Sequence, residues 1–286
     1  MVKRFLSLFN KEIIGLHQAA YLLGFFAICS QVLALIRDRI LASQFGASNT
    51  LDLYYSAFRI PDVIFVTVAS IVSVSVLIPF LIERFEKGEK EAKEFVDTVF
   101  SFFFCFIFVV GVTAYITAPY FMKLLFPVFY NSDSFSELIK LTRVLLLSPV
   151  FLGFSNLLAS ITQINRRFFI YAISPVVYNL GIIFGIIFLY PVLGLSGLGL
   201  GVAIGAFFHF AIQIPFIISQ RMFPVFRFPI KFSFIKKIIF TSLPRTITVS
   251  SNELAELFLI SFASFFTVGS ISVFNFSFNL QSVPFS

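Results

Sequence analysis

Long apolar runs alternate with short polar connections along the whole chain. Most runs hold about 20 residues or more, which is the length at which an α-helix crosses a hydrocarbon core of about 30 Å. A membrane β-barrel would instead show segments of about ten residues with alternating polarity. The pattern therefore predicts an all-α, polytopic membrane helical bundle with about eight transmembrane helices. The predicted helices cover 15–36, 56–82, 95–118, 141–163, 168–190, 193–219, 238–266 and a short last run from 268.

Basic residues concentrate in alternate connections between these runs. Most of the 21 Lys and Arg residues lie in the N-terminal tail and in the second, fourth and sixth connections, whereas the fifth and seventh carry none. Because basic loops stay on the cytoplasmic side, this asymmetry predicts a cytoplasmic N-terminus. The predicted segments are an amphipathic cytoplasmic N-terminus (1–12), a first bundle of six helices (13–221), a cytoplasmic interfacial linker (222–237) and the truncated start of a second bundle with helices seven and eight (238–286).

Composition supports the membrane assignment. The chain is 58% hydrophobic and only 12% charged, whereas a soluble domain has about 25% charged residues. The net charge of +7 is explained by the basic connections, so we expect no nucleic-acid partner. Cys29 and Cys105 both lie in apolar runs without metal-ligand spacing, which makes a disulfide framework or a zinc site improbable.

Motifs for catalysis are not found in the sequence. It contains no phosphate-binding loop with Lys-Ser/Thr, no paired-carboxylate spacing and no nucleophile elbow. His17 and His209 fall in different predicted helices and are better explained as polar groups at helix interfaces. We therefore expect no enzymatic activity, no cofactor and no metal.

Charged residues inside or at the ends of the apolar runs are the better functional candidates. Arg37 and Asp38 end the first run, Arg59 precedes Pro61 on the second, and Arg245 lies within the seventh. A charge at mid-membrane costs about 2.5–3.5 kcal/mol on translocon scales, so such residues usually line a polar cavity or pair with one another. We predict that these four residues bind the substrate. For Arg37, Asp38 and Arg59, a structural salt-bridge cluster at the outer face is the alternative.

Two glutamates follow Arg245 along the seventh run. Glu253 and Glu256 are three residues apart and therefore share one helix face. They could pair with Arg245, accept a coupling cation or form a plain buried ion pair. Guanidinium groups bind phosphate through two parallel hydrogen bonds, and an apolar groove beside them could hold a lipid tail. The pattern thus suits an anionic lipid-linked substrate.

Four stretches resemble one transporter family. They are RDRILASQFGASNTLDLYYSAFRIPD (37–62), IPFLIERFEKG (78–88), NRRFFIYAISPVVYNLGIIFG (165–185) and FASFFTVGSISVFNFSFNLQSVP (262–284). They look like the MurJ (MviN) lipid II flippases of the multidrug/oligosaccharidyl-lipid/polysaccharide exporter superfamily. The resemblance implies two helix bundles around a central cationic cavity, usually with fourteen helices. This chain would supply the first bundle and the first two helices of the second.

The resemblance also assigns and questions individual positions. Arg37 and Asp38 match the family's Arg-Asp pair of the first helix. At positions where the family often carries an arginine or a glutamate, this chain has Gln31, Phe65, Val66, Ser70 and Asn279. The position of the sodium-site residue known in some members falls in an apolar region near Leu259.

Together these observations predict a flippase that moves lipid II, an undecaprenyl-pyrophosphate-linked peptidoglycan precursor, across the bacterial cytoplasmic membrane by alternating access. The alternatives are a flippase for another polyprenyl-linked glycan and a truncated, non-transporting membrane scaffold. We expect a monomer that contacts membrane lipids and couples transport to the membrane potential or to a monovalent cation.

Overall fold

The computed structural model describes residues 15–130 and 132–282, and all regular secondary structure in these ranges is helical. The predicted all-α, polytopic bundle is confirmed. The predicted N-terminal segment 1–12 lies outside the described residues, as do the last residues of the segment 238–286.

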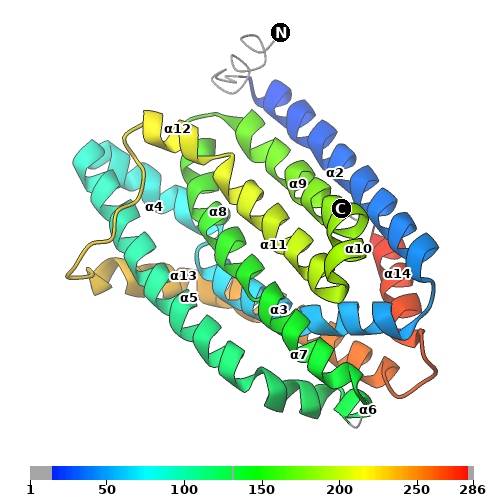
Figure 1. Cartoon of the computed structure of the whole chain (residues 1–286). Coiled ribbons are helices and arrows are strands. Elements are labelled where there is room, and N and C mark those ends of the chain that lie inside the picture. The colour runs from blue at the N-terminus through cyan, green and yellow to red at the C-terminus, as the bar shows by residue number, and fades with distance from the viewer. Residues whose placement is uncertain (1–14, 131, 283–286) are drawn as a thin grey trace.

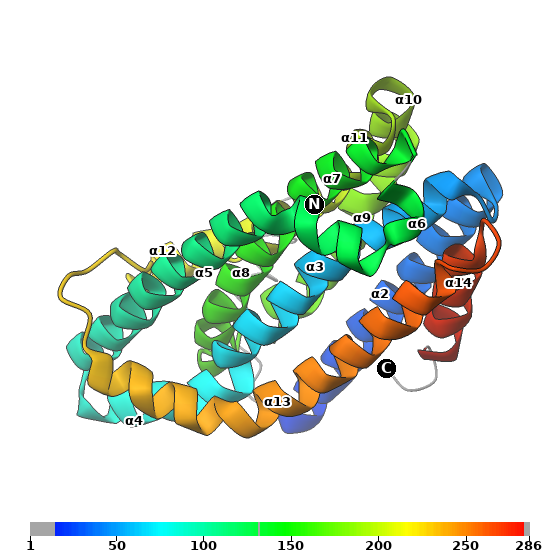
Figure 2. The same cartoon turned by 90° about the horizontal axis from the view of Figure 1, so that it is seen from below.

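The helices form an elongated bundle that α13 crosses on one side (Figures 1 and 2). Their bounds are α2 (Leu16–Phe45), α3 (Asn49–Ile71), α4 (Val74–Lys87), α5 (Glu89–Leu125), α6 (Pro127–Tyr130), α7 (Ser134–Leu145), α8 (Leu147–Ile164), α9 (Phe168–Phe184), the π-helix η1 (Gly185–Leu189), α10 (Tyr190–Leu193), α11 (Leu195–Ala211), α12 (Ile214–Ser219), α13 (Phe232–Ala263) and α14 (Ser270–Ser282).

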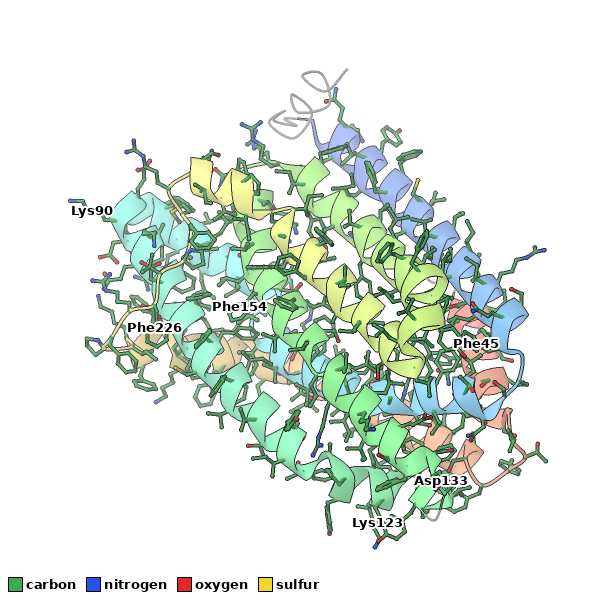
Figure 3. The ribbon with its side chains drawn as sticks, in the orientation of Figure 1. Phe45, Lys90, Lys123, Asp133, Phe154 and Phe226 are labelled. Atoms are coloured by element: carbon green, nitrogen blue, oxygen red, sulfur yellow. The ribbon has the colours of Figure 1, made fainter. Side chains whose placement is uncertain are left out.

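Six helical segments of the described chain are long and apolar enough to cross a membrane. They are His17–Phe45, Asn49–Lys87, Glu89–Leu125, Ser134–Ile164, Phe168–Leu193 and Leu195–Ser219. Each overlaps one of the first six predicted runs, and several are longer than the run because their ends are polar. The 37 residues of α5 span about 55 Å at 1.5 Å per residue, so this helix extends well beyond a hydrocarbon core. Lys90 and Lys123 lie at opposite ends of the molecule (Figure 3).

Helices α13 and α14 correspond to the seventh and eighth predicted runs. The 32 residues of α13 exceed a membrane span in length, but they include Lys236, Lys237, Arg245, Glu253 and Glu256. The described part of α14 has 13 residues. The count of eight spans and the cytoplasmic N-terminus therefore stay predictions.

The linker before α13 is fixed to α5 by hydrogen bonds from its backbone. The Val225 N–H donates to Asp97 Oδ1 at 2.8 Å, and the Arg227 N–H donates to Ser101 Oγ at 2.8 Å. Residues 222–231 are not helical, whereas 232–237 of the predicted linker already form the first turns of α13. The chain thus crosses from α12 to α13 in an extended segment held against α5 (Figure 1).

Glycines allow α9, and the π-helix η1 that continues it, to pack against α11 with their backbones in direct contact. A Cβ atom on Gly201 would lie 2.4 Å from Gly185 Cα, and one on Gly181 would lie 2.3 Å from Gly205 Cα. Such close approach is the usual role of small residues between membrane helices. We call these four residues the glycine contact. It fixes the position of α9, which carries Tyr178 and Asn179 toward the site described next.

Candidate functional site

Helices α2, α3, α9, α13 and α14 enclose a polar cavity of about 250 Å³. Its wall combines five charged side chains with tyrosines, asparagines and apolar residues. The lining residues are Arg37, Leu41, Tyr54, Tyr55, Phe58, Arg59, Asp62, Tyr178, Ile182, Glu253, Glu256, Asn275, Phe278 and Asn279. Residues from both predicted bundles therefore meet at one site, as α13 runs beside α3 toward α14 (Figure 2).

Arg59 is the most buried charge in this cavity, with only 5% of its surface exposed. Its Nη1 lies 2.7 Å from Glu256 Oε1 and 4.0 Å from Glu253 Oε1, and its Nη2 lies 3.6 Å from Asp62 Oδ2. Nη2 also donates to Asn275 Oδ1 at 3.4 Å, while Nε donates to the Tyr55 carbonyl at 3.2 Å. One guanidinium on α3 thus connects α3 to both α13 and α14.

Arg37 and Asp38 form a second charged pair at the edge of the same cavity. Arg37 Nε donates to Asp38 Oδ1 at 2.8 Å, and Arg37 Nη1 donates to Asn179 Oδ1 at 3.3 Å. The other carboxylate oxygen of Asp38 accepts from Asn279 Nδ2 at 3.0 Å. Asp38 is 8% exposed. A buried charge at this depth is retained because it is paired and hydrogen-bonded.

The charge balance of the lining differs from the cationic cavity that the family resemblance implies. Two arginines line the cavity together with three carboxylates, those of Asp62, Glu253 and Glu256. Glu253 and Glu256 both reach the cavity because residues three apart lie on one helix face. In this conformation the carboxylates therefore offset the arginine charges.

Arg245 lies away from the other predicted site residues. It is exposed, it donates a hydrogen bond to Ser75 Oγ at the start of α4, and it is not among the residues that line the cavity. Arg245 precedes Glu253 by eight residues, or about 12 Å along a helix. Among the described residues the glutamates face Arg59 in place of Arg245, in an ion pair between Glu256 and Arg59 that the sequence did not indicate.

A row of hydroxyl pairs continues the α3–α13 contact away from Arg59. Thr67 Oγ1 lies 3.2 Å from Ser250 Oγ, and Ser70 Oγ lies 2.7 Å from Thr246 Oγ1. We call these two pairs, together with Arg245 and Ser75, the polar seam. Hydroxyl pairs between membrane helices contribute packing and a modest interaction energy, and they can equally well be hydrated.

Asp52 holds the first turn of α14 against α3. It is 4% exposed and accepts hydrogen bonds from the Gly269 N–H at 2.6 Å, the Ser272 N–H at 2.8 Å and Ser272 Oγ at 2.5 Å. A carboxylate at a helix N-terminus satisfies amides that have no partner within the helix. Asn275 and Asn279 follow on the same face of α14, four residues apart, and this spacing was the signal available in the sequence for their role.

Groups that could hold a metal ion are not found in the described ranges. No three or more His, Cys, Asp or Glu side chains in 15–130 and 132–282 are arranged to bind a metal. His209 instead pairs with a hydroxyl, its Nδ1 lying 2.7 Å from Ser155 Oγ. The guanidinium, carboxylate and amide groups that line the cavity can recognise charged and hydrogen-bonding groups.

Several known proteins are similar to this chain. A probable lipid II flippase MurJ from Aquifex aeolicus is 26% identical over 276 residues, which cover 95% of this chain and 54% of that relative. The lipid II flippase MurJ of Burkholderia cenocepacia is 24% identical over 280 residues, covering 94% and 54%. A solved structure titled "Lipid II flippase MurJ, inward closed conformation" matches with a TM-score of 0.76 and 25% identity, covering 92% of this chain and 55% of that one.

These relatives are longer than this chain. The chain spans about half the length of the curated relatives that it matches. Their names and the six apolar helices make it a multi-pass protein of the bacterial inner membrane. The family model described as "Lipid II flippase MurJ" matches residues 41–286, and the chain therefore belongs to the lipid II flippase MurJ family.

Proposed function

We propose that this chain takes part in moving lipid II across the cytoplasmic membrane by alternating access, without a catalytic step. The observation that carries the proposal is the convergence of Arg37 and Arg59, from α2 and α3, on one cavity closed by α13 and α14. Two guanidinium groups can together bind the two phosphates of a pyrophosphate. The isoprenoid tail would stay in the lipid phase, because its transfer from the membrane to water is unfavourable.

The size of the cavity supports a cycle with more than one conformation. A pocket that buries a drug-sized ligand has about 300–1,000 Å³, and this cavity has about 250 Å³. A disaccharide-pentapeptide head group is larger than such a ligand, so the cavity must widen before it can admit one. Separation of α13 and α14 from α3 is the movement that would widen it.

We further propose the orientation and the driving force. The basic connections support a cytoplasmic N-terminus, which places α14's first turn and the Asp52 contact toward the outer face. The cargo is an anion that moves outward, and the membrane potential is negative inside. Each negative charge moved outward then gains about 2.3 kcal/mol per 100 mV. A monovalent cation is the second candidate for coupling. We propose that the protein works as a monomer surrounded by membrane lipids.

Complementation tests this function. The full-length gene is expressed in bacteria depleted of their own lipid II flippase, and growth and cell shape are measured. We expect the parent to restore growth, Arg37→Ala and Arg59→Ala to fail, and the control Arg39→Ala, whose side chain is exposed, to succeed. Arg245→Ala tests a third residue of the predicted binding set.

The outcomes separate the alternatives. A parent protein that reaches the membrane in normal amounts and still fails to restore growth would contradict lipid II as the cargo. Rescue of a strain that lacks a different polyprenyl-linked glycan flippase would then favour that cargo. Full rescue by Arg37→Ala and Arg59→Ala would contradict the site.

A further inference from the structure

The cavity carries an electrostatic conflict that the proposed function must resolve. Its lining carboxylates outnumber its arginines in this conformation, so an incoming pyrophosphate would be repelled by Asp62, Glu253 and Glu256. Arg59, the more buried arginine, has every guanidinium nitrogen within 3.4 Å of an oxygen of the protein itself. An anion can bind Arg59 only after one of these partners leaves.

Some of the groups that contact Arg59 lie on its own helix, and others lie on helices that could move relative to it. Tyr55 and Asp62 are on α3, the same helix as Arg59, and they move with it. Glu253 and Glu256 are on α13. A movement of α13 away from α3 would therefore withdraw two negative charges from Arg59 at once. The lining would change from two arginines and three carboxylates, a net charge of −1, to two arginines and one carboxylate, a net charge of +1.

The middle of the α3–α13 contact, next to Arg59, is suited to such a separation, whereas the apolar residues of α13 lie toward its two ends. The polar seam consists of hydroxyl pairs and one exposed arginine. When such groups part, hydrogen bonds to water replace those within the protein, and the net change in free energy per bond is small. An apolar interface exposed to water would oppose separation much more strongly.

We propose that Glu253 and Glu256 occupy Arg59 in the place of the substrate's anionic group, and that the anion and these two glutamates compete for one guanidinium. This inference rests on the proposed transport of an anionic cargo. When α13 lies against α3, Glu256 neutralises Arg59 and the cavity excludes anions. When the helices part, Arg59 binds the anion, and the bound anion then keeps Glu256 from returning.

A binding measurement tests the competition directly. The full-length protein in detergent is titrated with inorganic pyrophosphate by calorimetry. Loss of one charge-assisted hydrogen bond from the competitor corresponds to about a tenfold change in affinity. We expect Glu256→Gln, and more strongly Glu253→Gln with Glu256→Gln, to bind pyrophosphate at least about tenfold more tightly than the parent. Glu137→Gln is the matched control, because Glu137 is exposed on α7 and outside the cavity lining.

A cross-linking measurement tests the movement. Thr67→Cys and Ser250→Cys are introduced together in a protein with Cys29→Ser and Cys105→Ser, because the two side-chain oxygens lie 3.2 Å apart. We expect pyrophosphate to slow disulfide formation between the two introduced thiols. The Glu253→Gln, Glu256→Gln protein is expected to form this disulfide more slowly even without pyrophosphate.

The results separate this inference from the proposed function. Unchanged pyrophosphate affinity in Glu256→Gln, or cross-linking insensitive to pyrophosphate and to the glutamate substitutions, would overturn the competition even if the parent complements growth. Tighter pyrophosphate binding by Glu256→Gln that Arg59→Gln abolishes would support the competition, even if complementation contradicts lipid II as the cargo. Thermal unfolding of each variant establishes that it is folded.

Discussion

The glycine contact between α9 and α11 provides a sharp test of the packing. A methyl group added by Gly201→Ala would place Cβ 2.4 Å from Gly185 Cα, 3.0 Å from Gly185 N and 3.2 Å from Gly181 O. Ordinary van der Waals contact begins at 3.4 Å. All three atoms are backbone atoms of α9 or of η1, the π-helix that continues it, so no side chain can rotate away. The two helices must separate by about 1 Å, a value set by the closest of these contacts.

The expected cost follows from two opposing effects. Forcing extra atoms into a packed interface costs about 1–3 kcal/mol. Alanine is favoured over glycine within a helix by about 0.5–1 kcal/mol, which offsets part of that cost. We therefore expect Gly201→Ala to destabilise the protein by about 1–2 kcal/mol. Separation of α9 would also shift Tyr178 and Asn179, which contribute to the cavity and to the position of Arg37.

Thermal unfolding in detergent, followed by circular dichroism at 222 nm, measures this effect. Gly24→Ala is the matched control, because a Cβ atom on Gly24 in α2 meets no other atom within 4 Å. Helix propensity alone predicts that this control is as stable as the parent or slightly more stable. If Gly201→Ala unfolded at the same temperature as Gly24→Ala, the close backbone contact inferred for α9 and α11 would be wrong.

Two further predictions concern the attachment of α14 and of the linker. Asp52→Asn should destabilise the protein by about 1.5–3 kcal/mol, because one charge-assisted acceptor of the α14 amides is lost. The same thermal unfolding assay measures this change, and Asp133→Asn is the control because Asp133 is exposed. Asp97→Ala should speed tryptic cleavage after Arg227, because the Val225 N–H loses its acceptor on α5. An unchanged cleavage rate would show that other contacts hold the linker.

The long apolar runs made the helices predictable, since a membrane permits few alternatives to a helix. The ends were less predictable. α5 begins at Glu89, before the predicted start at 95, because GEKEAKE is a good polar helix sequence although it is not apolar. α13 likewise begins at Phe232, where Lys236 and Lys237 had suggested an interfacial linker. Hydropathy identifies the part of a helix that lies in lipid, and it does not report the helical turns outside it.

The candidate site was predictable only in part, because its chemistry depends on which distant charges meet. Arg37, Asp38 and Arg59 were identified from the cost of placing charge in an apolar run. That reasoning uses the position of each residue in the sequence and does not require its ion-pair partner to be known. The pairing of Arg59 with Glu256 joins residues 197 apart in the sequence, whereas proximity along the chain had suggested Arg245 as the partner of the glutamates. Helix packing decides between them.

Asn279 shows that a position that departs from a family pattern can still make a contact at the site. Read as a position in the sequence, it marks a cation that the family often carries and this chain lacks. In the structure its amide donates to Asp38, so α14 contacts the Arg-Asp pair of α2 without adding a positive charge. An amide holds the carboxylate without adding charge to the cavity. Since Glu253 and Glu256 add negative charge on α13, the cavity depends on the position of α13, more than on a fixed surplus of arginines, to become attractive to an anion.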